Sequence, residues 1–521
     1  MNRGGLFLLA LGVADVGPLA AQARFWREDE RVVITDQQTV YAVAATDARV
    51  YAATTTGLAI YDRRFRQWEP PVTAADGYPL DRITAALADP ADDAVWLGTA
   101  TGVVRYRPVF RSFDGYPVPG GVRDLAFDRD DAFQGIYLRS SAGWELLPRG
   151  GFSPVPATPP PPGRRIAPLR PELLEARIPY LRTMGQQALL DERLRQFHFT
   201  SGAVVPGTEE YFLGTDGMGL VFVDALVAQI EPLPAGLLSP GAGAVLAVRD
   251  GVWVGSDHQG ARTGLTFVSD DLQRYAYEEG PRGTGFRASV VRALTAREGE
   301  IWAGTDQGIV IVEPGGATRR LQAVDGLPDD EVFALATGPA GTWVATARGV
   351  ARVPPDTVLV VPTEGPPVPA LGLALARDSA WVAYTDGLGL AAPDGQVFFA
   401  PGSDTLPELR DAIVAVATLG DTVIAATFDR LLWRAAAGPW VVGRALSEVA
   451  PIYALAGDAS GLWVGGGGGL AHVRLAAGAV VPFPAPRDVP AAVRGIALSE
   501  RYLWLATEAG LVRFTRNAIT P

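Results

Sequence analysis

The sequence predicts an all-β fold built from many copies of one short strand-turn-strand unit. The unit reads apolar, Trp, apolar, Gly, Thr, then after two free positions another Gly and an alternating apolar run. Its clearest copies begin with Val95–Thr99 and Ile301–Thr305. In addition, 60 glycines and 42 prolines fall between the apolar runs, as expected for a chain with many tight hairpins.

The unit recurs eleven times, at steps of about 40 residues, which is the usual size of one β-propeller blade. The step from Trp302 to Trp343, for example, is 41 residues. The sequence therefore predicts a β-propeller architecture of about eleven blades. The large residues that anchor the units are Tyr51, Trp96, Tyr137, Phe212, Trp253, Trp302, Trp343, Trp381, Ile424, Trp463 and Trp504.

Each unit has a physical interpretation. The anchor supplies an apolar contact between neighbouring sheets, and the small residue two positions later leaves room for that neighbour. The second glycine ends the turn, where a positive φ is needed. A further strand lies upstream of many anchors, as in Val332–Ala336 and Ile452–Ala456, and its alanines suit a crowded innermost position.

The repeat resembles the two-component-regulator propeller repeat of periplasmic sensor regions. The resemblance rests on Trp302-Ala303-Gly304-Thr305 with Gly308-Ile309, followed by Asp325-Gly326-Leu327-Pro328 and Val332. It covers nearly the whole chain after residue 23 and implies a sensor-type propeller without the kinase part. Two units depart from it: Leu138-Arg139-Ser140 follows Tyr137, and a glycine run, Gly465–Gly469, follows Trp463.

Eleven blades exceed one ring, because closed propellers usually have about four to eight. We therefore expect two tandem propellers, the first over residues 24–280 and the second over residues 286–521, divided near residues 279–283. This division gives five blades before the break and six after it. The two ends of such a chain can also join one ring and help to close it.

Residues 150–203 interrupt the repeat. Four consecutive prolines, Pro159–Pro162, form a stiff extended segment. Residues 171–175 and 188–194 have helical spacing, with Pro171 suited to a first helical turn. We expect a short helical insertion, either a lid on its own ring or an element that binds a partner or bridges the domains.

The first 23 residues have the charged, apolar and small-residue order of a secretory signal, with cleavage expected after Ala23. No later stretch is long and apolar enough for a membrane span, so we expect a periplasmic or extracellular protein. The absence of cysteine excludes disulfides. A net charge of −12, from scattered acids, disfavours a nucleic-acid partner.

The sequence indicates neither a catalytic motif nor a cofactor. It has no phosphate-binding loop, nucleophile elbow or zinc-helix motif, and no lysine for Schiff-base chemistry. The histidines, His198, His258 and His472, are too dispersed for a metal set. Acids at equivalent turns, such as Asp306, are better explained by turn capping than by calcium, which needs clustered oxygens.

Candidate ligand-binding residues lie at the ring mouths, because equivalent positions of every blade share one face. Cations and aromatics recur in matching register at the entry to inner strands, a mixture able to hold an anionic or sugar-like ligand. Unusual turns supply the others. Each arginine could instead cap carbonyls between blades. The candidates are Tyr41, Arg123, Arg292, Tyr453 and Arg494 at strand entries, and Asp257, His258, Arg262, Tyr384 and Asp386 in turns.

We favour a non-catalytic binding module that recognises a protein or glycan partner as a sensor or scaffold. The alternatives are a structural subunit of an envelope or secretion assembly, and a propeller lyase or hydrolase. The first two are favoured because the repeat conserves structural residues within the chain and leaves few polar ones for chemistry.

Overall fold

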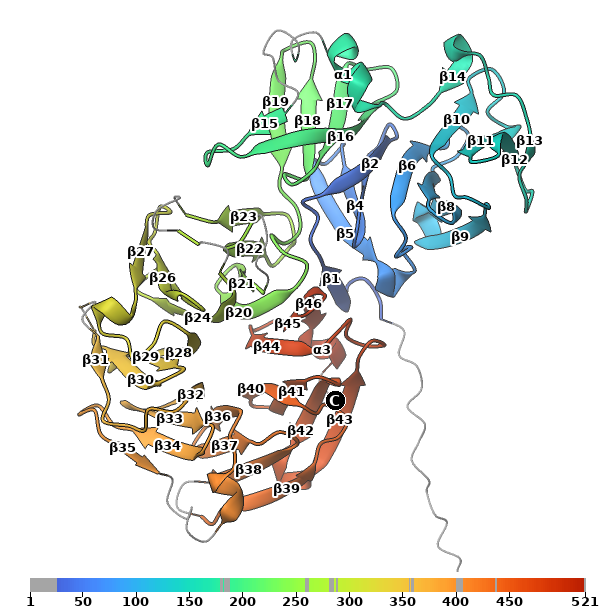
Figure 1. Ribbon diagram of the computed structural model, residues 1–521. Helices are drawn as coiled ribbons and strands as arrows, with labels where there is room; N and C mark the ends of the chain where they lie inside the picture. The colour runs from blue at the N-terminus through green and yellow to red at the C-terminus, as the bar shows by residue number, and fades with distance from the viewer. Residues whose placement is uncertain are drawn as a thin grey trace, which may run out of the picture.

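Eleven antiparallel sheets make up the protein, as the repeat predicts. The computed structural model describes residues 26–178, 181, 188–257, 262–280, 285–286, 289–355, 357, 360–399, 406–435 and 438–519. The sheets are numbered here in chain order and are arranged in two rings of unequal size (Figure 1).

Ring one consists of sheets 1 to 4. Sheet 1 holds β2 (Val40–Ala45), β3 (Arg49–Thr54), β4 (Gly57–Asp62) and β5 (Gln67–Thr73). Sheet 2 holds β6 (Ile83–Ala88), β7 (Val95–Thr99), β8 (Gly102–Arg107) and β9 (Ser112–Pro117). Sheet 3 holds β10 (Asp124–Asp128), β11 (Gly135–Ser140), β12 (Gly143–Pro148), β13 (Val155–Pro156) and β14 (Arg165–Ile166). Sheet 4 holds β15 (Ala188–Leu190), β16 (Gln196–Val204), β17 (Glu210–Thr215), β18 (Leu220–Asp224) and β19 (Gln229–Leu233).

Ring two consists of sheets 5 to 11. Sheet 5 holds β20 (Ala242–Val248), β21 (Gly251–Ser256), β22 (Leu265–Ser269) and β23 (Tyr275–Glu278). Sheet 6 holds β24 (Val291–Arg297), β25 (Glu300–Thr305), β26 (Gly308–Val312) and β27 (Thr318–Leu321). Sheet 7 holds β28 (Val332–Gly338), β29 (Gly341–Thr346), β30 (Gly349–Val353) and β31 (Val361–Pro362). Sheet 8 holds β32 (Ala370–Ala376), β33 (Ser379–Tyr384), β34 (Gly387–Ala391) and β35 (Val397–Phe399). Sheet 9 holds β36 (Ala415–Leu419), β37 (Thr422–Ala426), β38 (Arg430–Ala435) and β39 (Val441–Ala445). Sheet 10 holds β40 (Ile452–Asp458), β41 (Gly461–Gly466), β42 (Gly469–Arg474) and β43 (Ala479–Pro484). Sheet 11 holds β44 (Val493–Leu498), β45 (Tyr502–Thr507), β46 (Gly510–Thr515) and β1 (Arg31–Ile34). Among the described residues, α-helices are formed by α1 (Pro171–Arg177) and α3 (Arg516–Ile519).

The predicted anchors all lie in the strand that follows the inner strand of their sheet, which is the second strand in every sheet except sheets 4 and 11, where β15 and β1 come first. Most of them pack against the next sheet of the ring, as predicted. Trp302 shares a buried cluster with Val332 and Val344 of sheet 7. Trp504 of sheet 11 shares one with Val252 and Val254 of sheet 5, so this contact closes ring two.

Tyr137 is the exception, and it belongs to one of the two units with a degenerate motif. Its buried cluster contains residues of its own sheet and the adjoining Ala157, but none from sheet 4. The interruption of the repeat fills this gap. Residues 165–169, called the strap below, pair with β10 through Ile166 and Phe127 and with β16 through Leu169 and Gly202.

The strap makes the insertion part of the ring wall. Helix α1 follows it, begins with Pro171 at its first turn as predicted, and packs on β16 through Leu174. The helix predicted over residues 188–194 is wrong. Residues 188–190 form strand β15, which pairs with β16, because Leu189 can cover the apolar face of sheet 4 from that position.

The division between the rings differs from the one expected near residues 279–283. Inner strand β20 contacts both β24 and β44, so sheet 5 belongs to ring two, and the chain passes between the rings at residues 234–241. Strand β1 pairs with β46 and completes sheet 11. Ring one is therefore inserted after the first strand of ring two, and the two ends of the chain jointly close ring two, as the sequence allows.

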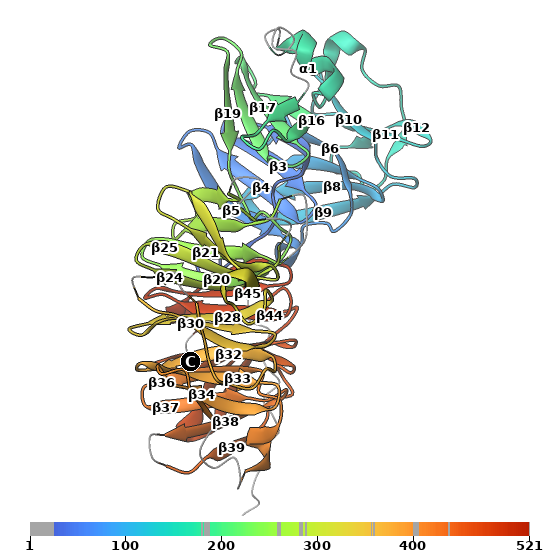
Figure 2. The ribbon, with the colours of Figure 1, turned by 60° about the vertical axis from the view of Figure 1, so that its left-hand side comes forward.

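A polar and aromatic junction joins the rings, which Figure 2 shows with ring two nearly edge-on. Tyr275 of ring two packs against buried clusters of both rings. The Gln273 side chain accepts a hydrogen bond from the Trp68 N–H and donates one to the Trp68 carbonyl, both at 2.9 Å.

The turn glycines give a stability prediction. Gly308 opens β26 with a φ of +97°, and an added Cβ would lie 2.4 Å from the Leu321 carbonyl oxygen. Gly143 opens the equivalent strand β12 with a φ of +118°, but its Cβ would meet nothing within 4 Å. We expect Gly308→Ala to lower the free energy of unfolding by about 3 kcal/mol and Gly143→Ala by about 1 kcal/mol, measured by urea titration of tryptophan fluorescence. Equal losses would contradict this account.

Candidate functional site

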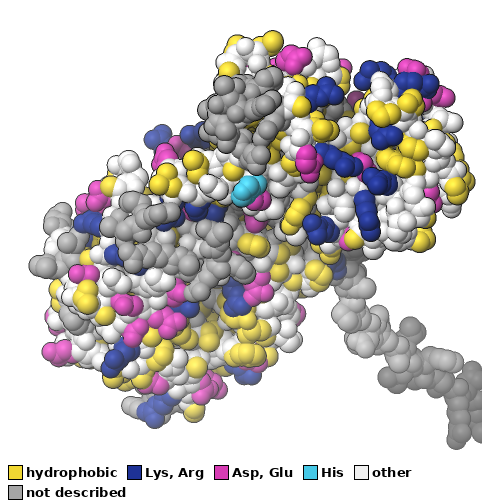
Figure 3. All heavy atoms as spheres, turned by 45° about the horizontal axis from the view of Figure 1, so that its top comes forward, with side chains coloured by type: hydrophobic (Ala, Val, Ile, Leu, Met, Phe, Trp, Pro, Cys, Tyr) yellow, Lys and Arg dark blue, Asp and Glu magenta, His cyan; other side chains and the backbone are white. Residues whose placement is uncertain are grey.

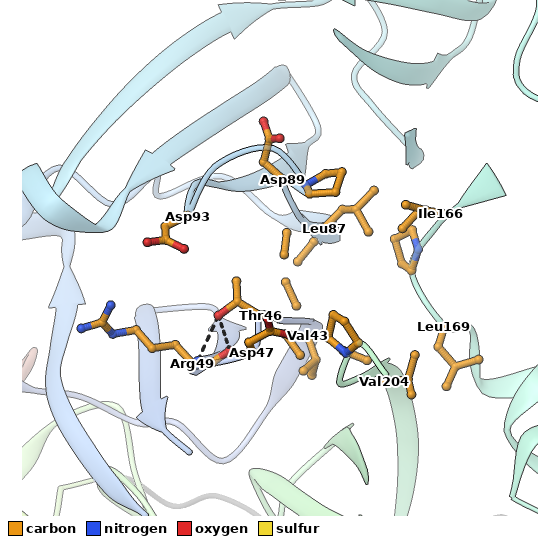
Figure 4. Close-up of a pocket in the computed structure, with 18 of the residues that line it drawn as sticks. Val43, Thr46, Asp47, Arg49, Leu87, Asp89, Asp93, Ile166, Leu169 and Val204 are labelled. Carbon is orange, nitrogen blue, oxygen red and sulfur yellow. Dashed lines mark hydrogen bonds between the residues drawn. The ribbon is translucent and has the colours of Figure 1, made fainter. Parts of the chain in front are cut away.

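A cavity of about 870 Å³ occupies the channel of ring one. Its walls are the inner strands β2, β6 and β16 together with the strap (Figure 4). It opens at the face that carries the first turn of each sheet, since residues 46–49, 89–93 and 206–207 line it. This volume lies within the range of small-molecule and cofactor sites. We call this cavity the funnel.

Small inner-strand residues create the funnel. The registers of β2, β6 and β16 each shift once near the start of the strand, and Val43, Ala86 and Gly202 occupy the same position after that shift. Gly202 lets the strap approach, because an added Cβ would lie within 3.4 Å of Leu213, Leu174 and Leu169 side-chain carbons. An alanine there would push the strap away from β16.

The funnel has an apolar inner part and a charged mouth. Leu87 of β6 and Ile166 and Leu169 of the strap line the inner part, whereas Asp47 and Asp93 stand toward the other side (Figure 4). Both aspartates are exposed, and neither forms an ion pair with another described residue.

The remaining acids of the mouth are already paired. Asp89 is buried and accepts hydrogen bonds from Arg149, at 2.8 Å, and from the Trp96 indole, at 3.1 Å. Asp92 pairs with Arg105 and Arg149. Asp47 and Asp93 are therefore the acids available to a ligand.

The predicted strand-entry residues lie at the opposite face. Arg292, Tyr453 and Arg494 each occupy the shifted position of an inner strand of ring two. The Arg292 guanidinium pairs with Glu331 at 2.9 Å and lies 5.3 Å from the Phe333 ring centre.

Arg494 and Tyr453 belong to neighbouring sheets and stack on each other. The Arg494 guanidinium lies 4.0 Å from the Tyr453 ring centre and pairs with Glu508. Their matching register is as expected, but their role in binding stays a prediction. Because their partners already neutralise both arginines, an anionic ligand would have to displace a glutamate.

Tyr41 and Arg123 belong to ring one, so the five strand-entry candidates do not form one site. The Tyr41 hydroxyl accepts a hydrogen bond from Thr55 at 3.3 Å, and Arg123 is exposed just before β10. Both lie at the end of ring one opposite the funnel mouth. Their ligand-binding role also stays a prediction.

The turn candidates are dispersed. Arg262 lies in the ring junction, where it pairs with Glu279 at 2.9 Å and donates to Gln38 at 2.6 Å. Tyr384 is fully buried, and burial raises the pKa of its hydroxyl. Asp386 is exposed in a turn and Asp257 is half-buried, whereas His258 lies outside the described residues.

The two described histidines have structural surroundings. His198 pairs with Asp216 at 3.2 Å. His472 is buried beside Trp463, with ring centres 4.5 Å apart, and burial lowers its pKa. No group of three or more potential ligands among the described residues could hold a metal ion. Figure 3 shows cationic and anionic side chains interspersed across the face it displays.

Sequence reasoning missed the funnel because its distinguishing features are not in the repeat motif. The motif draws attention to the second turns and strand entries, whereas the funnel opens at the first turns. The available signal was the interruption after Tyr137, combined with small inner-strand residues such as Ala86 and Gly202. The strap that completes the wall could not be recognised from spacing.

Comparison with solved structures supports the architecture. PorZ of Porphyromonas gingivalis, an essential surface component of the type-IX secretion system, matches with a TM-score of 0.57 at 10% identity over 93% of this chain and 87% of PorZ. The protein is a tandem β-propeller. Among the described residues, no helix is long and apolar enough to cross a membrane.

Other similar structures have lower scores. The extracellular domain of the hybrid two component system BT3049 from B. thetaiotaomicron matches at a TM-score of 0.44 and 14% identity over 90% of this chain, which spans 60% of that domain's length. The virginiamycin B lyase of Staphylococcus aureus matches at 0.45 and 17% identity, over 53% of this chain and 95% of the lyase. No family model and no curated protein sequence matches the chain.

Proposed function

We propose that this propeller is a non-catalytic, extracytoplasmic binding module whose ligand enters the ring-one funnel. The observation that carries the proposal is the funnel itself: a cavity of about 870 Å³ with apolar inner walls and two acids without an ion pair at its mouth. The signal-like first 23 residues support export, and the sensor-type repeat supports a binding role.

The test is a substitution that fills the funnel. Ala88 lies on its wall at the end of β6 and is half-buried. We expect Ala88→Trp to lower ligand retention at least tenfold, because the larger side chain would narrow the funnel at this wall, where Ala88 packs against residues of sheets 1 and 2. The protein is exposed to a periplasmic extract, recovered, and analysed by native mass spectrometry for retained molecules.

Ala296→Trp is the matched control. Ala296 lies in β24, four residues after the shifted position of its inner strand, as Ala88 does in β6, and it belongs to ring two. Retention that falls equally in both variants, or not at all in Ala88→Trp, would contradict the proposal. Deleting residues 150–203 would be a poor test, because it removes both the strap and β16.

A structural subunit of an envelope assembly is the second candidate. It is favoured by exposed apolar side chains on the outermost strands of sheets 8 and 9: Phe398 and Phe399 are 56% and 50% exposed, and Val441 and Val442 also face solvent. PorZ, a secretion-system component, has the same fold. Sedimentation of the protein with envelope fragments, lost in Phe398→Ser/Phe399→Ser but kept in Ala88→Trp, would favour this candidate.

A further inference from the structure

The inner edges of two strands in ring one are already occupied by an extended segment of the same chain. Gly202 of β16 and Leu169 of the strap exchange two backbone hydrogen bonds, at 2.8 and 3.1 Å. On the other side of the strap, Ile166 pairs with Phe127 of β10, and the Arg129 N–H donates to the Arg164 carbonyl at 2.8 Å. The channel of ring one therefore accepts extended peptide at the free edges of its inner strands.

Strands β2 and β6 also face the funnel with their inner edges, and on these two strands no chain segment of the strap covers that edge. In an antiparallel pair, the backbone groups of successive residues point alternately toward and away from the partner strand. The Thr46 N–H donates to the Arg49 carbonyl at 2.8 Å and Ala44 pairs with Tyr51. The backbone N–H and carbonyl of the intervening Ala45 therefore point away from β3.

The same alternation holds in sheet 2. The Asp89 N–H donates to the Ala94 carbonyl at 2.8 Å and Leu87 pairs with Trp96, so the backbone of Ala88 points away from β7. Ala45 and Ala88 both line the funnel. No hydrogen bond between described residues uses their outward-facing backbone groups.

The funnel lining distinguishes a peptide from a glycan. It contains no aromatic side chain among the described residues, so a sugar ring would find no surface on which to stack. It offers aliphatic walls at Leu87, Ile166 and Leu169, and strand edges that match the backbone of an extended chain. Asp47 and Asp93 add two exposed carboxylates at the mouth, which Arg49, Arg64 and Arg129 also line.

We propose that the funnel ligand is an extended peptide that pairs with the inner edge of β6 at Ala88, directs apolar side chains toward the strap, and places a lysine, arginine or N-terminal ammonium beside Asp47 and Asp93. This inference rests on the proposed function and specifies its ligand. Backbone pairing supplies affinity, and the apolar walls and the two acids supply selectivity.

The experiment selects binders from a displayed library of random hexapeptides on the intact protein and measures a labelled synthetic binder by fluorescence polarisation. The selected peptides should alternate apolar residues and carry a cation at one end. Methylating the peptide nitrogens that pair with the strand edge should weaken binding at least tenfold. This readout leaves the protein unchanged, so it does not depend on the folding of a variant.

Protein variants test the same contacts. Ala88→Pro removes the outward N–H without touching a bond to β7, and should weaken binding at least tenfold, whereas Ala296→Pro at the matched position of ring two should leave it unchanged. Asp47→Asn with Asp93→Asn should weaken a cationic peptide severalfold at low salt and little at high salt. Asp386→Asn, on the opposite face of ring two, is the charge control.

The outcomes separate the two proposals. If Ala88→Trp abolishes retention of a cellular ligand but no hexapeptide binds better to the wild type than to Ala88→Trp, the funnel binds a ligand of another class and the peptide inference is wrong. Full binding by the N-methylated peptide would also overturn it. If Ala88→Trp changes neither readout, the proposed function fails as well.

Discussion

Replacing Ile34 with aspartate is expected to open ring two and to lower the free energy of unfolding by about 4 kcal/mol. Ile34 is fully buried (0% exposed) and pairs with Leu511 across β1 and β46. It shares its cluster with Trp504 and Val254, the residues that join the last sheet of ring two to the first. A carboxylate there would lose its hydration without gaining a cation. Urea titration of tryptophan fluorescence measures the loss.

A conservative variant separates charge from shape. Ile34→Val keeps an apolar side chain and should cost about 1 kcal/mol. Hydrogen exchange locates the damage: the aspartate variant should lose amide protection in β44–β46 before ring one is affected. If these strands keep their protection, β1 is not the strand that closes ring two.

The blade count could be predicted because each sheet repeats the same local requirements. Trp302 and Trp504 lie at the same place in their sheets, and each is fully buried against the next sheet. The glycine that opens the third strand has a positive φ in many sheets, as at Gly308, Gly349 and Gly510, although Gly57 and Gly102 at the same place do not. Such requirements act within about ten residues, so they leave a pattern in the sequence.

The ring boundary could not be predicted, because closure depends on contacts between distant segments. Nothing local to β1 distinguishes pairing with β46 from pairing with its neighbour β2. The prediction of a division near residues 279–283 placed five blades before the break and six after it. The actual division depends on β20 packing against β44, two strands about 250 residues apart.

The candidate site shows the same limit. Arg292 and Arg494 were correctly placed in equivalent register, yet their glutamate partners come from separate turns or sheets. The funnel depends on the strap reaching β16 at Gly202, a contact between residues of the interruption and the next repeat. Helical spacing over residues 188–194 was misleading, because Leu189 is buried just as well from a strand that pairs with β16.

Removing the Glu279 side chain is expected to loosen the junction between the rings. Glu279 is 8% exposed and holds three arginines: Arg193 at 3.4 Å, Arg195 at 2.6 Å and Arg262 at 2.9 Å. Two of them reach it from residues that follow β15, and Arg262 also donates to Gln38, in the segment between β1 and β2, at 2.6 Å. Glu279→Ala would leave these cations without their shared partner, at a cost of about 3 kcal/mol.

Small-angle scattering and hydrogen exchange at the junction measure this effect. The variant should scatter as a more extended particle, and amides of β23 should exchange faster. Glu508→Gln is the matched control, because Glu508 forms an ion pair with Arg494 that is largely exposed and should contribute less than about 1 kcal/mol. An unchanged scattering curve for Glu279→Ala would mean that the aromatic contacts of Tyr275 hold the rings without the ion pairs.

The junction also predicts a pH dependence. Burial alone would raise the pKa of Glu279, but the hydrogen bond from Arg195 and the charges of Arg262 and Arg195 outweigh it, so the pKa lies below its ordinary value of 4.5. A carboxyl group with a depressed folded-state pKa stabilises the folded protein above its unfolded-state pKa. The stability difference between wild type and Glu279→Gln should therefore be largest at neutral pH and should shrink as the pH falls below about 4.5.

Burial raises the pKa of nearby Asp36, which acts in the opposite direction, but Asp36 is present in both proteins, so its contribution largely cancels in the difference. A difference that grows toward acid pH would show that Glu279 is not the ionised partner of these arginines.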